Sequence, residues 1–161
     1  MRRVYLETTV ISYLTAPRPS RTVIVAAHQE ITVEWWAKRR HDFELVVSEL
    51  VLREAAGGDP EIAQLRLAAL AGLPRLALTE EALRLGMEFV RRRILPEKAA
   101  EDGMHIAVAT VHSVDYLLTW NCAHIANPEI QERLAEFLFE RGLVLPFVCT
   151  PEELLGGDLD E

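Results

Sequence analysis

Short apolar runs alternate with longer stretches of helical periodicity along the chain. The apolar runs have the length of strands, and the longer stretches repeat their apolar residues with the period of an α-helix. We expect strands at 3–7, 43–48, 75–78, 114–119 and 143–149. We expect helices at about 9–14, 21–40, 49–56, 60–71, 80–93, 98–112 and 128–141. Strands that alternate with helices predict βαβ units, and hence a parallel sheet covered on both faces.

Turn residues and composition indicate one domain. Gly57-Gly58-Asp59-Pro60 closes one helix and opens the next. Thr150-Pro151-Glu152-Glu153 has the form of a capping box, so we interpret its acids as structural. No repeat or low-complexity segment is visible. We therefore expect a single domain over 1–155, followed by a short acidic tail at 156–161.

The composition narrows the functional classes. Two cysteines make no disulfide framework, and no apolar run has the length of a signal peptide or of a membrane span, so we expect a cytoplasmic protein without membrane contact. The net charge is −8, with 25 acids against 17 bases. Such a balance argues against non-specific nucleic-acid binding through basic patches. An acidic chain that acts on a polyanion needs metal ions, which directs attention to the carboxylates.

One carboxylate and one polar segment follow two of the expected strands. Glu7 comes directly after the first strand, and Thr119-Trp120-Asn121 comes after the fourth. In an open parallel sheet, ligands bind outside the carboxyl ends of the strands. Glu7 is therefore either the cap of the helix that follows or part of a site at this edge.

Helix geometry separates two glutamates after the second strand. Leu50, Val51 and their apolar neighbours form one broad face, and Glu54 lies within it. Glu49 lies outside that face, four residues before Arg53, as an exposed ion pair would. A buried acid needs a partner, a metal ion or a raised pKa. Glu54 is thus the candidate functional acid.

The stretch EDGMHIAVATVH adds a third acid on a helix that is apolar nearly all round. Asp102 lies in its first turn, where an acid can also simply favour the helix dipole. His105, three residues on, is either a hydrogen-bond partner of the site or a satisfied core histidine. A zinc site from Cys122 and His124 with His105 or His112 is a weak alternative, because this spacing fits no standard zinc motif.

The order of these residues resembles the PIN domain, and more closely the VapC-type toxins of bacterial and archaeal toxin–antitoxin pairs. The similarity covers nearly the whole chain. It is carried by four segments: YLETTVISYL, VSELVLREAAGGDPE, EDGMHIAVATVHSVDYLLTWNCAHIAN and VCTPEELL.

The resemblance implies an α/β/α sandwich and metal-dependent cleavage of RNA by an endoribonuclease. The family's acidic positions fall at Glu7, Glu54 and Asp102, and its fourth polar position falls at Asn121. Thr9 and Thr119 accompany them as hydroxyls. Glu7 and Asn121 depart from the aspartates usual at the first and fourth positions. Glu7 and Asp102 would bind Mg²⁺ or Mn²⁺ directly, with Glu54 as a ligand or water-holder. The implied partners are an antitoxin and a second copy of the chain in a homodimer.

Two other classes of function stay open from the sequence. One is a catalytically silent PIN-like module that holds a partner protein, and the other is a metal-dependent phosphohydrolase for small esters. For the helix at 21–40, we expect the stripe of Val23, Ala27, Ile31 and Trp35, with Ile24 beside it, to be mostly core. Trp36 points about 100° away from Trp35, and we expect it either to pack in the core or to form a groove for an antitoxin segment or a dimer contact.

Overall fold

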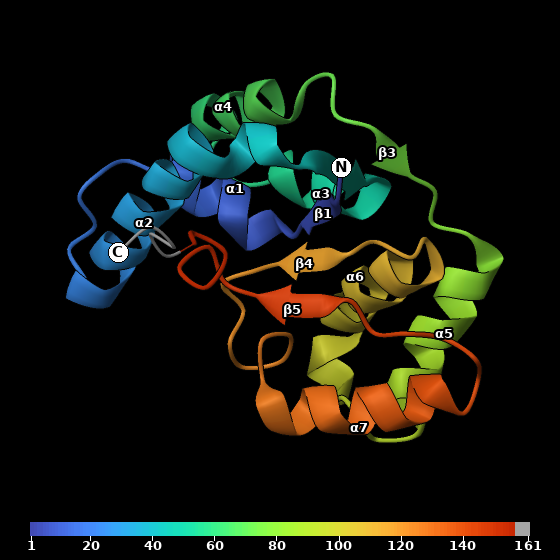
Figure 1. Cartoon of the computed structure of the whole chain (residues 1–161). Coiled ribbons are helices and arrows are strands. Elements are labelled where there is room, and N and C mark those ends of the chain that lie inside the picture. Colours follow the sequence, from blue (N-terminus) through green and yellow to red (C-terminus); the bar gives the residue numbers. More distant parts are fainter. Residues whose placement is uncertain (157–161) are drawn as a thin grey trace.

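A five-stranded, entirely parallel sheet forms the centre of the computed structural model, which describes residues 1–156 (Figure 1). The strand order is β3-β2-β1-β4-β5. Each strand falls inside its expected range: β1 Arg3–Leu6, β2 Glu44–Ser48, β3 Arg75–Leu76, β4 Tyr116–Leu118 and β5 Phe147–Cys149. The prediction of a parallel sheet is confirmed, and the strands are shorter than the apolar runs that contain them.

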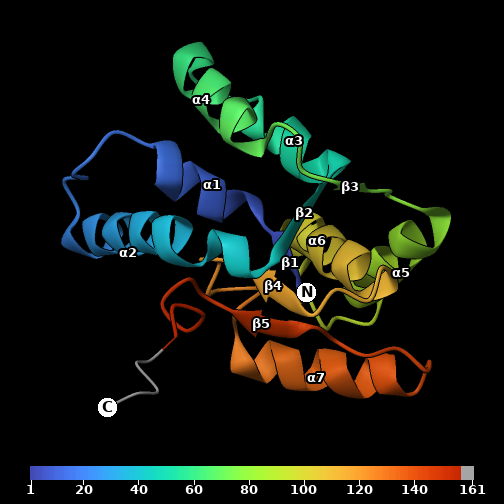
Figure 2. The same cartoon turned by 45° about the horizontal axis from the view of Figure 1, so that its top comes forward.

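Helices cover both faces of the sheet and make the expected three-layer α/β/α sandwich. The helices are α1 Thr8–Thr15, α2 Val23–Arg39, α3 Glu49–Ala55, α4 Pro60–Leu70, α5 Glu80–Arg91, α6 Ala100–Val111 and α7 Pro128–Phe139, with short 3-10 turns at Arg40–Asp42 and Glu97–Ala99. The first four helices lie on one face and α5, α6 and α7 on the other (Figures 1 and 2). Each expected helical stretch therefore holds one helix.

The strand order places a topological switch point between β1 and β4. From β1 the chain moves outward to β2 and β3, and it then crosses back to β4 and β5. The helices that follow the two strands consequently lie on opposite faces, and in open parallel sheets the carboxyl ends of two such strands are where ligands bind. Leu6 pairs with Leu118 at this edge, so Glu7 and Thr119 are neighbours.

Buried side chains and helix caps fix this arrangement. Val4, Tyr5 and Leu6 of β1 are fully buried, as expected for a central strand covered on both faces. The capping box is confirmed, because Thr150 N–H donates to Glu153 Oε1 (3.0 Å) and Glu153 N–H donates to Thr150 Oγ1 (3.3 Å). Glu153 is therefore structural, as the sequence indicated, whereas the Glu152 side chain is exposed.

The apolar stripe expected on α2 is mostly not core. Val23 and Ile24 are 83% and 67% exposed, whereas Gln29, Thr32 and Trp35 are the buried residues of the helix. Polar side chains can face inward here because their groups are satisfied. Gln29 Oε1 accepts from Ser20 N–H (2.9 Å), and Thr32 Oγ1 donates to the His28 carbonyl (2.6 Å). The helical period alone therefore predicted the wrong face of α2 to be buried.

The two adjacent tryptophans separate as their angular spacing suggested. Trp35 is fully buried and stacks near Phe43, with ring centroids 6.3 Å apart. Trp36 is half-buried, and the Arg40 guanidinium lies 4.7 Å from its ring centre. Its role in an interface stays a prediction.

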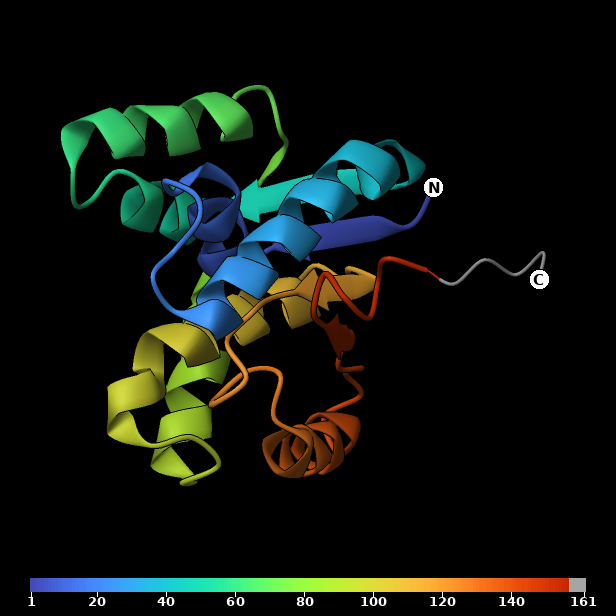
Figure 3. The ribbon, with the colours of Figure 1, turned by 90° about the vertical axis from the view of Figure 1, so that its left-hand side faces the viewer.

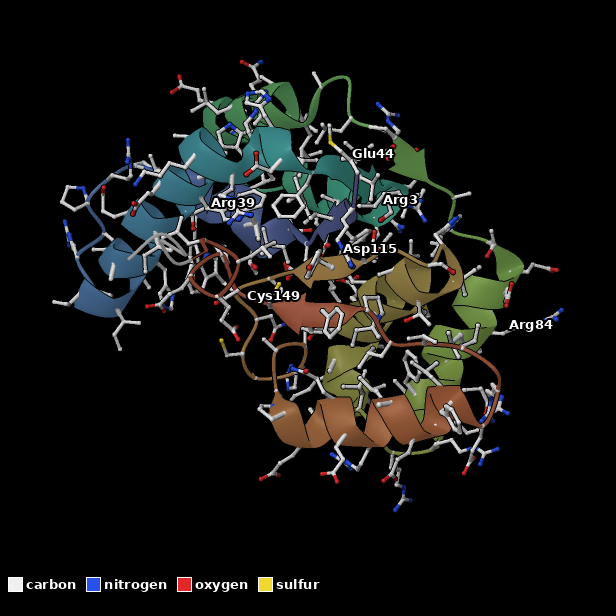
Figure 4. All side chains as sticks on the ribbon, viewed as in Figure 1. Arg3, Arg39, Glu44, Arg84, Asp115 and Cys149 are labelled. Atoms are coloured by element: carbon white, nitrogen blue, oxygen red, sulfur yellow. The ribbon has the colours of Figure 1, made fainter. Side chains whose placement is uncertain are left out.

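Arg39 anchors the end of α2 to the C-terminal segment. Its Nη1 donates to the carbonyls of Leu155 (2.8 Å) and Leu154 (3.3 Å), and Figure 4 labels this arginine. Apart from Gly156, the expected acidic tail lies outside the described residues. Within the described part of the chain, no helix is both long enough and apolar enough to cross a membrane. Both cysteines are free thiols.

Candidate active site at the carboxyl edge of the sheet

Glu7 is both a helix cap and a buried carboxylate at the switch point. It occupies the position between β1 and α1, where its Oε2 accepts a hydrogen bond from Thr9 N–H (2.6 Å). Its own N–H donates to the Leu118 carbonyl (3.0 Å), so the backbone is fixed on β4. The side chain is 3% exposed. Figure 3 views this edge from the side to which the β4 and β5 arrowheads point in Figure 1.

Burial governs the charge of Glu7. Desolvation raises the pKa of this carboxyl, and the nearby Glu54 charge raises it further. His105 and the Thr9 hydrogen bonds oppose the rise without cancelling it. The fold therefore holds an acid where its negative charge is costly. An arrangement of this kind is typical of a site that awaits a cation or a proton.

Glu54 has hydrogen-bond partners on two other elements, and the charge of the preceding residue, Arg53, also acts on it. Thr8 Oγ1 donates to Glu54 Oε1 (2.8 Å), and His105 Nε2 lies 2.6 Å from the same oxygen. Partial burial is the largest single influence and raises the Glu54 pKa, but His105, Thr8 and Arg53 together lower it below its usual value. Glu54 is thus a stabilised anion, in contrast to Glu7.

A chain of hydrogen bonds through Tyr5 and Ser48 orients the His105 ring. Its Nδ1 lies 2.7 Å from the Tyr5 hydroxyl, which lies 2.8 Å from Ser48 Oγ. Burial raises the pKa of Tyr5, so the phenol keeps its proton and can donate to Nδ1. In that arrangement Nε2 carries the proton that is donated to Glu54. His105 is therefore a satisfied core histidine and a partner of the site at the same time.

A second group of polar side chains, which contains the Asp102 carboxylate, lies beside Glu7 and Glu54. His124 Nδ1 donates to Asp102 Oδ2 (3.1 Å), and both side chains are 24% exposed. His124 N–H also donates to Asn121 Oδ1 (3.0 Å), while Asn121 N–H donates to Thr119 Oγ1 (2.9 Å). Asn121 thus shapes the turn that presents His124 to Asp102.

Two links connect these clusters. Trp120 N–H donates to Thr9 Oγ1 (2.9 Å), which joins the loop after β4 to the first turn of α1. Asp102 and His105 are three residues apart on α6 and share one helix face. The structure therefore brings Glu7, Glu54 and His105 together and sets Asp102 next to them with its own partner.

Sequence reasoning missed several members of this network. Tyr5, Thr8 and Ser48 were assigned no role, and His124 was considered only for zinc. The available signals were local: His124 follows Asn121 by three residues, and Tyr5 carries a hydroxyl between the apolar residues Val4 and Leu6. The contact between Tyr5 and His105 spans 100 residues, so no local pattern could reveal it.

The zinc alternative and the role of Glu49 are also decided here. Cys122 is exposed, and His112 Nε2 bonds the Ala77 carbonyl (2.8 Å) away from the site. Glu49 is exposed as expected, but its ion pair is with Arg75 across the strand ends (3.6 Å) and not with Arg53. The prediction of an Arg53 partner is wrong because β3 lies beside β2 and supplies a closer cation.

Among residues 1–156, no group of three or more histidine, cysteine or acidic side chains is placed to hold a metal ion. The expected convergence of Glu7, Glu54 and Asp102 on one ion is therefore not preformed. The donor chemistry nevertheless suits Mg²⁺ or Mn²⁺, which prefer oxygen and need only one or two carboxylates besides water and phosphate. Among the described residues, the hydrogen bonds to the Glu7 carboxylate come from Thr9, whose N–H donates to Oε2 (2.6 Å). The metal-binding roles stay predictions.

Comparison with known proteins identifies the fold. No known protein-family profile and no curated protein sequence matches the chain. The structure of VapC20 from Mycobacterium tuberculosis, described as a sarcin-ricin loop cleaving toxin, superposes with a TM-score of 0.58 at 15% identity, over 74% of this chain and 91% of that one. VapBC2 from Rickettsia felis, bound to a DNA fragment from its promoter, gives 0.52 at 16% identity, over 92% and 98%. At this identity the likeness establishes a PIN-like α/β/α fold.

Proposed function

We propose that this protein is a metal-dependent endoribonuclease, the toxin of a toxin–antitoxin pair that hydrolyses RNA phosphodiester bonds. The observation that carries the proposal is the placement of Glu7 and Glu54 at the switch point of the sheet. One is a buried acid with a raised pKa and the other is a stabilised anion beside it. Structural residues rarely combine such opposite environments at a ligand-binding edge.

The protein's own groups prepare this site for a polyanion and a cation. Mg²⁺ or Mn²⁺, held by Glu7, Glu54 and Asp102, would offset the phosphate charge and lower the pKa of a bound water. Thr9 N–H fixes the direction of Glu7, and Thr8 with His105 fixes Glu54. His124 holds Asp102 in the same way. Each carboxylate is thus held in one orientation by a neighbouring group, although among residues 1–156 the three are not yet arranged around one ion.

An arginine-lined cleft supplies positive charge that the acidic chain otherwise lacks. Arg91, Arg93 and Arg133 line a cleft of about 600 Å³ between the end of α5, the segment before α6, and α7. Glu97 lines it too, and Arg91 is paired with Glu88 (2.7 Å), so the free positive charge comes from Arg93 and Arg133. Arginine forks match phosphate geometry. We therefore propose that this cleft, lined in part by the segment that precedes the helix of Asp102, holds part of the RNA backbone.

The fold comparison supports the biological setting of the proposal. Two of the proteins with a similar fold are a sarcin-ricin loop cleaving toxin and a VapBC2 complex bound to promoter DNA. By that analogy we propose an antitoxin as the protein partner and a second copy of the chain as a dimer partner. Cytoplasmic localisation would follow from that setting.

A cleavage assay with two matched variants tests the proposal. Wild type, Glu54→Gln and Glu49→Gln are incubated with a structured RNA and with a small phosphodiester, in Mg²⁺, Mn²⁺ or EDTA. We expect metal-dependent RNA cleavage by wild type and Glu49→Gln, and a loss of at least about a hundredfold in Glu54→Gln. The two variants make the same chemical change on the same helix.

The outcomes separate the three classes of function. Hydrolysis of the small ester without RNA cleavage would identify a phosphohydrolase. Absence of both activities in a folded wild type would identify a silent interaction module. Equal RNA cleavage by the two variants would show that Glu54 has no part in the reaction.

A further inference from the structure

Three aromatic rings gather beside the carboxylates without a role in the proposed chemistry. Tyr13 comes from α1, His28 from α2, and Trp120 from the loop after β4. The His28 and Trp120 rings are stacked, with centroids 4.0 Å apart and planes at 11°. Tyr13 lies 6.0 Å from His28 and 6.3 Å from Trp120. Residues far apart in sequence thus form one aromatic cluster.

Trp120 is the fixed base of this cluster. Its Nε1–H donates to Thr32 Oγ1 (2.7 Å), and its backbone N–H donates to Thr9 Oγ1 (2.9 Å). The side chain is buried, at 7% exposure. The indole is held by its Nε1–H bond and by burial, and the backbone is held by its own bond to Thr9, so the ring sets the plane against which His28 stacks.

Tyr13 and His28 differ from Trp120 because they are less buried and their polar groups have no hydrogen-bond partner among residues 1–156. Both side chains are half-buried. Within residues 1–156, neither the Tyr13 hydroxyl nor the His28 ring forms a recorded hydrogen bond, whereas the Tyr5 hydroxyl has two partners. Interior packing alone would not require a hydroxyl and an imidazole at an exposed ring surface.

The aromatic cluster and the candidate active site are built on the same two elements, α1 and the loop after β4. Thr9 and Tyr13 are one turn apart on α1, and Thr9 N–H is the donor to Glu7. Trp120 is the residue before Asn121, which orients the loop of His124 and Asp102. A nucleotide chain that passes the carboxylates would therefore pass these rings within a residue or two.

We infer that Tyr13 and His28 form a stacking surface for a nucleobase of single-stranded RNA next to the scissile phosphate. The inference rests on the proposed nuclease function and names the substrate element that this site takes. An unpaired base offers a flat π-face to the rings and polar edge atoms to the unused hydroxyl and imidazole. Because stacking tolerates every base, the surface selects unpaired RNA over duplex, and the edge contacts add a preference among bases.

The stacking surface is tested by comparing protein variants that lack a ring on RNA probes with and without bases. Binding is measured by fluorescence anisotropy with Mg²⁺ in the Glu54→Gln background, to prevent cleavage. The probes are oligoadenylate of about twelve nucleotides and a ribose-phosphate chain of the same length without bases. The protein variants are Tyr13→Leu, His28→Leu, Tyr13→Phe and, as the matched loss of an exposed ring elsewhere, Phe139→Leu. Phe139 is 82% exposed on α7.

We expect the parent protein to bind oligoadenylate on the order of tenfold more tightly than the baseless chain. Tyr13→Leu and His28→Leu should remove most of that preference, while Tyr13→Phe and Phe139→Leu keep it. Circular dichroism checks that each variant is folded, and His28→Leu gives the answer for the stacking surface if Tyr13→Leu does not fold.

Two results would overturn the inference. One is equal binding of both probes by the parent. The other is an unchanged base preference in Tyr13→Leu and His28→Leu, and loss of antitoxin capture in the same variants would then assign the rings to a protein contact. A base preference in a protein whose wild type cleaves no RNA would refute the nuclease proposal and leave the stacking surface standing.

Discussion

Replacement of Glu7 by glutamine should stabilise the protein at neutral pH. Burial raises the pKa of Glu7 above its usual 4.5, so the folded state disfavours the charge that the unfolded chain carries freely. Between 4.5 and the raised value, the folded state binds a proton that the unfolded state lacks. Stability therefore falls as the pH rises through this window, and the cost is fully present above it. Glutamine has no such charge and removes the cost.

The size of the effect follows from two opposing contributions. One pKa unit corresponds to about 1.4 kcal/mol of differential free energy. Glutamine still offers an oxygen to Thr9 N–H, so the weakened cap costs at most about 1 kcal/mol. We expect a net gain in stability at neutral pH, and each kcal/mol of that gain would raise the melting temperature by roughly 2–4 °C in a domain of this size.

Glu54→Gln is the matched control because it should destabilise the protein at neutral pH, whereas Glu7→Gln should stabilise it. The pKa of Glu54 is lowered, so its charge contributes stability that is present above 4.5 and lost as the pH falls through the folded-state pKa. Loss of the charged acceptor for Thr8 and His105 should cost about 1–3 kcal/mol at neutral pH.

Urea unfolding in EDTA, at neutral pH and at a pH below both folded-state pKa values, measures both variants. At the acidic pH, the unfolding free energy of each variant should approach that of wild type. A Glu7→Gln variant that is less stable than wild type at neutral pH, or whose difference does not change with pH, would refute the reasoning about burial.

Three further predictions address the metal, the RNA and the partner. Divalent ions at about a hundredfold excess over their Kd should stabilise wild type by roughly 2.7 kcal/mol in thermal unfolding, and Asp102→Asn should lose most of that gain; an equal gain in both would exclude Asp102 as a ligand. Arg133→Gln should weaken RNA binding and reduce the salt dependence of log Kd by about one, which a salt titration checks; an unchanged slope would remove the cleft from the RNA path. Trp36→Ala should change the mass in solution or abolish antitoxin capture, and a folded variant that changes neither would remove Trp36 from the interface.

The sequence predicted the fold well because burial on both faces leaves a strong local pattern. Val4 to Leu6 and Leu45 to Val47 are uninterrupted apolar runs, and each lies in the sheet between layers of helices. The expectation failed on α2, where Val23 and Ile24 face solvent. A helical period shows that an apolar stripe exists, but only the neighbouring elements decide whether that stripe or the Gln29–Thr32 face packs inward.

For the site, the sequence by itself determined which carboxylates are unusual. Glu7 at a strand end and Glu54 on an apolar face follow from position and period alone. Tertiary structure decided their electrostatic states, because these depend on contacts across the sheet. His105 reaches Glu54 over 51 residues and Tyr5 over 100, and the Asp102 cluster depends on a turn after β4. Hydrogen bonding and desolvation act over a few ångströms in space, whatever the distance along the chain. Only the folded chain therefore makes the charge of Glu7 unfavourable and that of the neighbouring Glu54 favourable.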